Sequence, residues 1–543
     1  MKSIKFWGSA LAVTLTTFGA LTTGCTYDFC RDYLNGDCAI ATGGQGGAAT
    51  SSSTSTITSS SDSSTSSGVV ADCVPTLTQG PKDDTCGVFV DPASGTDAAA
   101  GTMTAPQKTL AAALVTWVPG KAIYVCEGAL TDTDALSIQA GVVVYGGLDC
   151  GAGYKIASAT SRSALAPNAG VIPLTLVAGG AATELHRLSI TATAAAAPGS
   201  SAIGVVIGDV AATLESVDVS TGDGVAGVNS VTPTDNIGPS DPNDMTIRGN
   251  DGAAANTTTV GTPNPGAPAK PNPLCASVGG KGGDGGEIVA TSPQAGVTGS
   301  PGTATPLPVP VGMNNGQGGP GDVGVGCEAG HQGANGEAAL DAAGASGPTS
   351  LGTLSTMGYL GAFGGTGIDG NPGQGGGGGG GARGKHLPSP DTRGASGGSG
   401  GAGGCGGKGA GGGGPGGASI ALVLLGMTTP TLIDVALVTG KGGDGGAGAS
   451  GEFGGSGGNG GSGGGGSGTL PACNGGKGGQ GSSGGAGGGG RGGHSLGIAY
   501  VTAAPAAGFT VTHGAAGAAG ATAGAGAPAD PGVADDTLEL GAN

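Results

Sequence analysis

Acidic and basic side chains on predicted strands are the part of this chain that could do chemistry. Polysaccharide hydrolases and lyases need clustered carboxylates, and the lyases also need a basic group for proton abstraction. The candidates are Glu184, His186, Arg187, Asp209, Glu215, Asp218 and Asp434.

Three features argue against catalysis by this set. Glu215 and Asp218 would face different sides of one strand, because an odd offset inverts the side chain. The position of Asp218 recurs as Ser189 and Ala436, so the pattern contains no acidic ladder. Aromatic platforms for sugars are scarce, since only 2 Trp are present. One of them, Trp7, lies in the amino-terminal segment that is predicted below to be a signal peptide. We therefore expect no catalytic residues and keep a polysaccharide-binding or polysaccharide-cleaving protein as an alternative.

Cysteines are the other reactive groups. Of 11 Cys, Cys25 follows an apolar amino-terminal segment, and the others form an even set suited to disulfides in an oxidising compartment. The first four of these ten cysteines, Cys30, Cys38, Cys73 and Cys86, include no Cys-x-x-Cys pair and have no His nearby. We therefore expect them to form disulfides and not a metal site. Cys126 and Cys150 are 24 residues apart and could lie near enough to pair. The disulfide candidates are Cys30, Cys38, Cys73, Cys86, Cys126, Cys150, Cys275, Cys327, Cys405 and Cys473.

Glycine-rich motifs for ions or phosphates are incomplete. The segments 279–284 and 364–369 come nearest to calcium-binding Gly/Asp repeats, but Gly286 and Asn371 replace the apolar residue after the Asp. No Gly-Lys pair is followed by Ser or Thr, as a phosphate loop requires. We expect no cofactor.

The elements that would position these side chains are copies of one strand pair. Three copies span 203–222, 420–440 and 496–514, and an earlier one spans 174–192. Leu185, Leu214 and Leu432 hold one position of the pattern, and long insertions separate the copies. Equal patterns at unequal spacing indicate one repeating scaffold with a shared core. That core should contain Val205, Ile207, Leu422, Leu424, Ile498 and Tyr500.

The amino terminus indicates export. Lys2 and Lys5 precede an apolar stretch, and Leu21-Thr22-Thr23-Gly24-Cys25 resembles a bacterial lipobox, in which Cys25 would be lipidated. The lipobox Leu is displaced by one residue. By the same resemblance, Thr26 after the Cys implies the outer membrane. The Ser/Thr run 50–67 predicts a flexible tether.

The first predicted strands also resemble a known family. Residues 88–97 (VFVDPASGTD), then Gly101-Thr102 and Pro106–Ala113 (PQKTLAAA), are similar to the amino-terminal cap of pectin-lyase-like right-handed parallel β-helix proteins. This resemblance implies an all-β fold, a right-handed parallel β-helix interrupted by long glycine-rich insertions.

Glycine tracts fill much of the remaining chain, at 279–286, 373–417 and 440–493. Gly-Gly-X triplets are compatible with disorder, and also with packed polyglycine-II-like strands that have three residues per turn. The tracts are similar to those of PGRS-type glycine-rich surface proteins. The expected regions are a signal peptide (1–25), a tether (26–85), first coils (86–224), an insertion (225–418), a coil (419–440), an insertion (441–494), a coil (495–514) and a low-complexity tail (515–543).

Composition narrows the function. The chain has 128 Gly in 543 residues, only 10% charged residues and a formal charge of −18, which disfavours a conventional α/β enzyme and nucleic-acid partners. We expect a noncatalytic structural or adhesive lipoprotein on the cell surface. Its partners would be the membrane through the lipid anchor, a surface polysaccharide or protein, and further copies of itself. A self-assembling extracellular matrix component is a further alternative.

Overall fold

The computed structural model describes residues 71–234, 238–257, 262–289, 291–306, 315–332, 345–386, 391–466 and 470–542. Within these ranges the protein is all-β: it has a single α-helix, α1 (Leu110–Thr116), and its large sheets are mainly parallel. The predicted signal peptide and residues 26–70 of the predicted tether, with Cys25, Cys30 and Cys38, lie outside the described residues.

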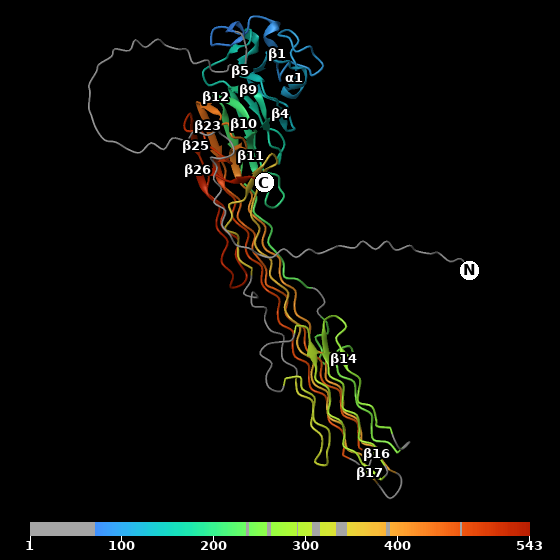
Figure 1. The fold of residues 1–543 in the computed structure, drawn as a ribbon. Helices are drawn as coiled ribbons and strands as arrows, with labels where there is room; N and C mark the ends of the chain where they lie inside the picture. The colour runs from blue at the N-terminus through green and yellow to red at the C-terminus, as the bar shows by residue number, and fades with distance from the viewer. Residues whose placement is uncertain are drawn as a thin grey trace, which may run out of the picture. The chain divides into compact units, whose positions relative to one another are not determined.

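Three parallel sheets form the body of the fold, and successive turns of the chain add one strand to each (Figure 1). We call three such successive strands a rung. The first sheet contains β1 (Gly87–Val90), β2 (Ala122–Cys126), β5 (Val143–Asp149), β9 (Gly179–His186), β12 (Val210–Glu215) and β22 (Thr431–Ile433), with β6 (Lys155–Ile156) antiparallel to β5. The second contains β3 (Gly128–Ala129), β7 (Ser163–Leu165), β10 (Leu188–Ala192), β13 (Asp218–Thr221), β23 (Val435–Thr439) and β25 (Phe509–Thr512). The third contains β4 (Leu136–Ile138), β8 (Leu174–Leu176), β11 (Ala202–Ile207), β21 (Ser419–Leu424), β24 (Ser495–Tyr500) and β26 (Ala534–Glu539).

Shorter elements lie outside these sheets. Three 3-10 turns span Ala71–Cys73, Asp84–Cys86 and Cys150–Ala152. The small sheets are formed by β14 (Lys270–Pro271), β15 (Ser277–Gly279) and β18 (Thr303–Ala304), by β16 (Ile288–Val289) and β17 (Ser292–Pro293), and by β19 (Thr353–Ser355), β20 (Gly358–Leu360) and β27 (Gly541–Ala542).

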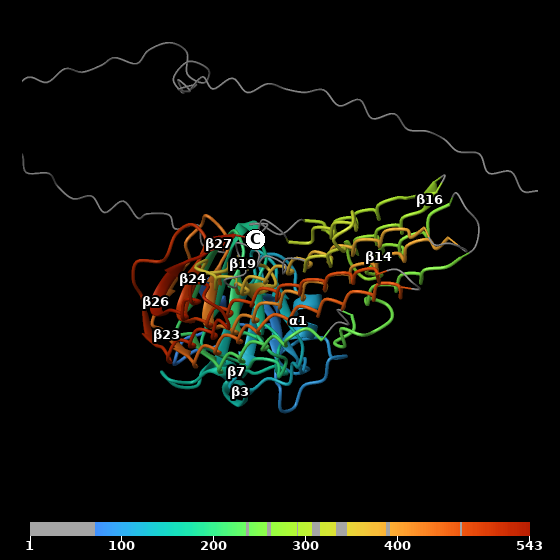
Figure 2. The ribbon, with the colours of Figure 1, turned by 90° about the horizontal axis from the view of Figure 1, so that it is seen from below.

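The repeat predicted from the sequence is confirmed by the pairing register. Leu214 lies opposite Leu185 on one side and Leu432 on the other, although the chain leaves after Thr221 and returns only at Ser419. Figure 2 shows β24 beside β26, which adds a further strand beyond the last copy of the pattern. Strands far apart in sequence therefore stack as neighbours.

One apolar core runs through all the rungs. It includes every core residue predicted from the repeat, with Tyr500 partly buried against it. Leu110 and Ala113 of α1 join this core beside β1 and β2, and Thr109 caps the helix by accepting the Ala112 N–H at 3.1 Å. Strands such as β10 and β13 supply this core by alternating buried with partly exposed positions, whereas β11 and β21 are buried at every position and face it with one side.

Buried hydroxyls mark the points where the chain leaves and rejoins the sheets. Thr221 Oγ1 lies 2.8 Å from Ser419 Oγ, and Thr439 Oγ1 lies 2.8 Å from Ser495 Oγ. Each pair joins the end of a second-sheet strand to the start of a third-sheet strand. In the sequence pattern the chain leaves a sheet at Thr-Gly and rejoins a sheet at Ser. The hydroxyls of this Thr and this Ser therefore form a hydrogen-bonded junction.

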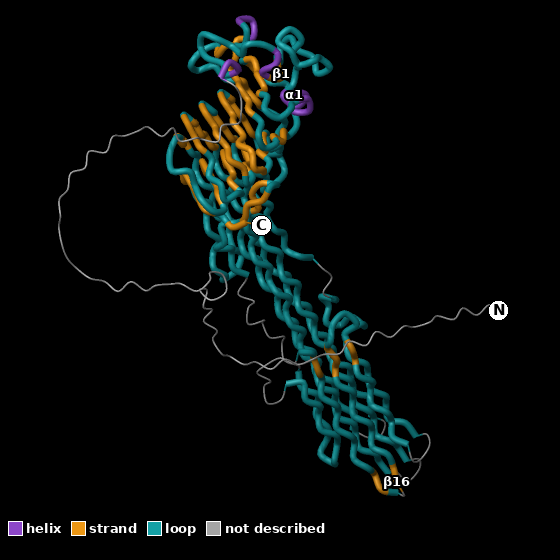
Figure 3. The backbone as a smooth tube through the Cα atoms, turned by 45° about the horizontal axis from the view of Figure 1, so that its top comes forward, coloured by secondary structure: helices purple, strands orange, loops and turns teal. Residues whose placement is uncertain are grey.

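The described parts of the glycine tracts are bonded to one another and run side by side as extended chain outside the sheets (Figure 3). Three successive N–H groups, those of Gly400, Gly401 and Ala402, donate to the carbonyls of Gly280, Gly476 and Ile247 at 2.9–3.0 Å. The same three neighbours recur every third residue, since Gly397, Gly398 and Ser399 donate to Gly283, Cys473 and Asn250. Each tract is thus surrounded by several others.

The number of neighbours explains the glycine pattern. In 375–381 every residue faces another backbone: a Cβ on Gly376, Gly377 or Gly378 would lie 1.8–2.1 Å from a carbonyl oxygen of a different segment. Where a tract has an open side, every third position carries a side chain, as at Lys281 and Asp284. The all-glycine run 375–381 is therefore an interior stretch. Gly-Gly-X does not by itself mark a free face, since Ser396, Ser399 and Ala402 occupy that position and are buried.

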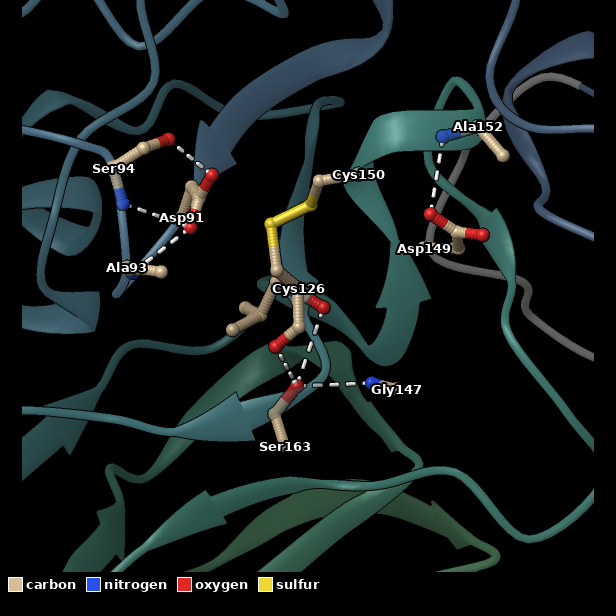
Figure 4. The surroundings of a disulfide bond; sticks show 10 residues. Asp91, Ala93, Ser94, Cys126, Gly147, Asp149, Cys150, Ala152 and Ser163 are labelled. Atoms are coloured by element: carbon tan, nitrogen blue, oxygen red, sulfur yellow. Dashed lines mark hydrogen bonds between the residues drawn. A yellow bond between two sulfur atoms is a disulfide. The ribbon is translucent and has the colours of Figure 1, made fainter.

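Four disulfides are present among the described residues: Cys73–Cys86, Cys126–Cys150, Cys275–Cys405 and Cys327–Cys473. Figure 4 shows the second, with Ser163 Oγ beneath it donating to Cys126 O at 2.7 Å and accepting the Gly147 N–H at 2.9 Å. The last two close 130 and 146 residues between glycine tracts. In the chain-entropy model each could contribute roughly 4–5 kcal/mol.

Order extends beyond the expected coil boundaries at both ends. Residues 71–86 pack on the first sheet through the Cys73–Cys86 bond, although the tether was expected to reach residue 85. In the carboxy-terminal segment, Val533 N–H donates to Nδ1 of the buried His494 at 2.9 Å. Burial lowers the pKa of His494 to about 4, so this imidazole is neutral and can accept that bond.

Replacing Leu424 by Asp tests the shared core. Leu424 is 2% exposed, and we expect the variant to lose at least as much unfolding free energy as a buried Leu→Ala change, roughly 2–5 kcal/mol. Chemical denaturation measures it. Val438→Asp, at a position 46% exposed on β23, should cost under about 0.5 kcal/mol. Equal stability of the two variants would contradict a common core.

Two glycine-to-alanine changes test the tract packing. A Cβ on Gly378 would lie 1.9 Å from Lys281 O, whereas a Cβ on Gly465 meets nothing within 4 Å. We expect Gly378→Ala to lower the free energy of unfolding by roughly 1–3 kcal/mol, as overpacking does. Gly465→Ala should be neutral or slightly stabilising. Amide hydrogen exchange in 373–417 would report the difference, and unchanged protection in Gly378→Ala would rule out the close packing.

Candidate functional site

A row of rings on the first sheet leads to the candidate site. Phe89, Tyr124, Tyr145 and His186 occupy one register position on β1, β2, β5 and β9. Their ring centroids are 4.9, 5.8 and 4.6 Å apart in that order, all stacked. The residues around Cys73 and Cys86 cover the first rings, so the row becomes accessible near His186.

His186 lies between two carboxylates. Its Nε2 is 3.2 Å from Glu184 Oε2 on the same strand, and its Nδ1 is 3.0 Å from Glu215 Oε2 on the next rung. The side chain of Glu215 is 48% exposed, against 14% for His186, so Glu215 is the member that a ligand can reach. Register places these groups together, because His186 is the direct partner of Glu215.

The electrostatics favour a protonated imidazole. Burial alone would lower the pKa of His186, but the hydrogen bonds to Glu184 and Glu215 outweigh it and raise the pKa above its ordinary value. The hydrogen bond from His186 lowers the pKa of the Glu215 carboxyl in turn. A protonated His186 donates through both nitrogens, and it therefore has none left to act as a general base.

A cavity of about 150 Å³ opens beside this cluster. It is lined by Tyr145, His186, Arg187 and Glu215, with Val74 and Pro75 from the amino-terminal segment. Arg187 has a left-handed backbone (φ 58°), and its Nη1 donates to Ala159 O at 2.8 Å. Ligand pockets usually measure about 300–1,000 Å³, so this one suits a single small polar group.

The other sequence candidates lie elsewhere. Asp209 Oδ1 accepts the N–H groups of Met427 and Thr428 and holds a turn of the neighbouring rung. Asp218 pairs with Arg162 Nε at 3.4 Å. Asp434 Oδ2 accepts the Ser216 hydroxyl at 3.1 Å.

The sequence analysis was wrong about Glu215 and Asp218. They were assigned to one strand, but Ser216 adopts a left-handed conformation (φ 52°) and turns the chain from β12 to β13. The two acids belong to different sheets for this reason. Asp218 does align with Ser189 and Ala436 as predicted.

The two segments considered for calcium contain paired acids. Asp284 lies 2.8 Å from Lys281 Nζ, and Asp369 lies 2.8 Å from Lys408 Nζ. Across the described ranges, no group of three or more His, Cys, Asp or Glu side chains is arranged to hold a metal ion. No helix in the same ranges is both long and apolar enough to span a bilayer.

No protein family and no curated protein matches the chain, so comparison with known proteins assigns it neither a family nor a function.

Titration of His186 tests the cluster. Because its folded pKa is raised, we expect the pairing to stabilise the fold below about pH 6.5 and to be lost as pH rises through the folded pKa. Glu215→Gln should lower the His186 pKa by removing a negative acceptor, and NMR of the imidazole would follow it. Glu452→Gln, on a glycine tract, is the matched control. A His186 pKa that is unchanged in Glu215→Gln would refute the assignment.

Proposed function

We propose that this protein is a noncatalytic surface lipoprotein with a structural or adhesive role. It would be built as a right-handed parallel β-helix from which polyglycine-II-like tracts extend. The one-strand-per-sheet order of the rungs and the pectin-lyase-like cap sequence support the β-helix. The three-residue period of the tract hydrogen bonds supports the polyglycine-II-like conformation.

The observation that carries the proposal is the all-backbone packing of the interior run 375–381. Ordering glycine costs more conformational entropy than ordering any other residue. The interior run 375–381 nevertheless has carbonyl groups where its side chains would be. This run brings no side chains of its own for catalysis. It suits display, spacing or contact better than chemistry.

Export and anchoring rest on the amino-terminal sequence. The segment ending at Cys25 is similar to a lipobox, and the disulfides are consistent with an oxidising compartment. The lipid on Cys25 would hold the chain at the outer membrane.

Lipid labelling tests the location. The full chain expressed in a Gram-negative bacterium should incorporate labelled palmitate and fractionate with the outer membrane. Cys25→Ala should abolish the label, whereas Cys30→Ala should retain it. Label that persists in Cys25→Ala would refute the anchor.

Joining Gly442 to Gly492 tests the role of the tracts. The joint removes nearly all of tract 440–493, including Cys473 of the Cys327–Cys473 bond, but leaves every strand of the three sheets, so far-UV circular dichroism should still show a β-rich protein. Cells that display this variant should lose retention in a whole-cell pull-down. Full retention would mean that the tracts are not the contact surface.

A second candidate is polysaccharide binding at the His186 cluster. Accessible Glu215 and Arg187 beside a stacked Tyr145–His186 pair favour it, because sugars combine polar edges with apolar faces. Pectin and alginate plates would reveal binding or cleavage, which Glu215→Gln should abolish and Glu452→Gln should not. The same response from both variants would exclude the cluster.

A further inference from the structure

The third sheet ends at β26 with an open edge. β26 is the last strand of this sheet, and among the described residues it pairs only with β24. At the opposite end of the stack, α1 covers the core by packing Leu110 and Ala113 beside β1 and β2. Because α1 is the single α-helix of the described ranges, no helix there covers β26 in the same way. An open strand edge offers unpaired N–H and C=O groups to another chain.

The side chains change character at this edge. Three columns of side chains run across the sheet from β11 through β21 and β24 to β26, and each is apolar until it reaches β26. The columns are Ile203, Ile420, Leu496 and Asp535; Val205, Leu422, Ile498 and Thr537; and Ile207, Leu424, Tyr500 and Glu539. The apolar members pack in the core or in the cluster on the outer face of the sheet. The last strand thus places polar groups where the three strands before it place apolar ones.

The acids of β26 have no partner that would explain them. Asp535, Asp536 and Glu539 are exposed and make up three of the six residues of the strand. No salt bridge within the described part of the chain includes any of them. β25, which ends the second sheet, has no charge but is only 4 residues long, and a short edge strand is itself a poor template for pairing.

These acids make pairing between two copies unfavourable. A two-fold contact brings the same surface of both copies together, so β26 of one copy would meet β26 of the other. The carboxylates of the two strands would then oppose one another, and like charges on neighbouring strands destabilise pairing. Burying them without a cation would cost further free energy. The same edge with apolar columns would instead continue the stack.

We propose that Asp535 and Glu539, with Thr537 between them, prevent a second copy of this chain from adding to the third sheet. β26 ends the sheet through its side chains, whereas α1 covers the other end as a separate element. Terminal units of stacked folds need a polar outer side to stay soluble, and β26 supplies it. Contact between copies therefore has to use another surface, such as the glycine tracts.

The inference goes beyond the proposed function, because it concerns one strand edge and needs neither the lipid anchor nor an adhesive partner. A failed lipid-labelling experiment would leave it intact, and its own failure would leave the lipid anchor intact.

Restoring the apolar columns tests the proposal. The full chain with Asp535→Ile, Thr537→Ile and Glu539→Leu should form dimers in analytical ultracentrifugation, whereas the wild type in the same detergent should keep the mass of one copy. Glu127→Leu with Asp134→Ile removes two exposed acids outside β26 and should stay monomeric. A monomeric triple variant would overturn the proposal, and so would dimers of equal strength in this control.

Hydrogen exchange shows whether the contact uses β26. The amides of 534–539 should become more protected in the triple variant as its concentration rises, and association without that protection would contradict the proposal. Concentration-dependent protection of the same amides in the wild type would also contradict it.

A charge-reversed variant separates charge from polarity. Asp535→Lys with Glu539→Lys keeps like charges on the edge and should therefore remain monomeric. Dimers of this variant would show that charge does not block the edge. If circular dichroism shows that the triple variant is unfolded, Asp535→Asn with Glu539→Gln takes its place, with dimers again expected and their absence counting against the proposal.

Discussion

Close approach of backbone to backbone, with no Cβ between, is the constraint on which the ordered tracts depend. Side chains normally hold segments apart and fill the space with apolar contact. Here the carbonyl oxygen of one tract lies where the Cβ of another would be, as at Gly378 beside Lys281. Hydrogen bonds therefore replace apolar burial as the source of order. Individually they contribute only about 0.5–1.5 kcal/mol, so their number matters.

The sheets and the tracts satisfy their backbone groups differently, and the protein joins the two systems at a few defined places. In the sheets, each inner strand bonds to two neighbours and buries side chains on one or both faces. In the tracts, N–H groups turn toward several neighbours in succession. The hydroxyl pairs Thr221–Ser419 and Thr439–Ser495 lie at the change from one system to the other. Long-range disulfides such as Cys275–Cys405 add covalent links within the second system.

The sequence was sufficient for the shared core of the sheets because apolar alternation reports burial. It was not sufficient for β26, which was assigned to a low-complexity tail because none of its residues is buried. Leu185, Leu214 and Leu432 could be aligned across insertions of any length, and the core followed from that alignment. The state of the tracts could not be decided, because Gly-Gly-X satisfies the requirements of a disordered linker as well as those of a packed strand. The left-handed corner at Ser216 was missed since Ser has no strong signal for that conformation. The His186–Glu215 contact was recoverable, because aligning Leu185 with Leu214 already places the next residues side by side.

The long excursion between β13 and β21 has a consequence for how the chain acquires its structure. β11 pairs on one side with β8, which is near it in the sequence. On its other side it pairs with Ser419–Leu424 (β21), which follows more than two hundred residues later. Contacts between residues so far apart in the sequence form slowly, because the entropic cost of closing the loop comes before the stabilisation gained from strand pairing. During synthesis the early rungs therefore expose an apolar third-sheet edge until most of the chain has emerged. A protein with this topology benefits from being held unfolded until its last strands are available.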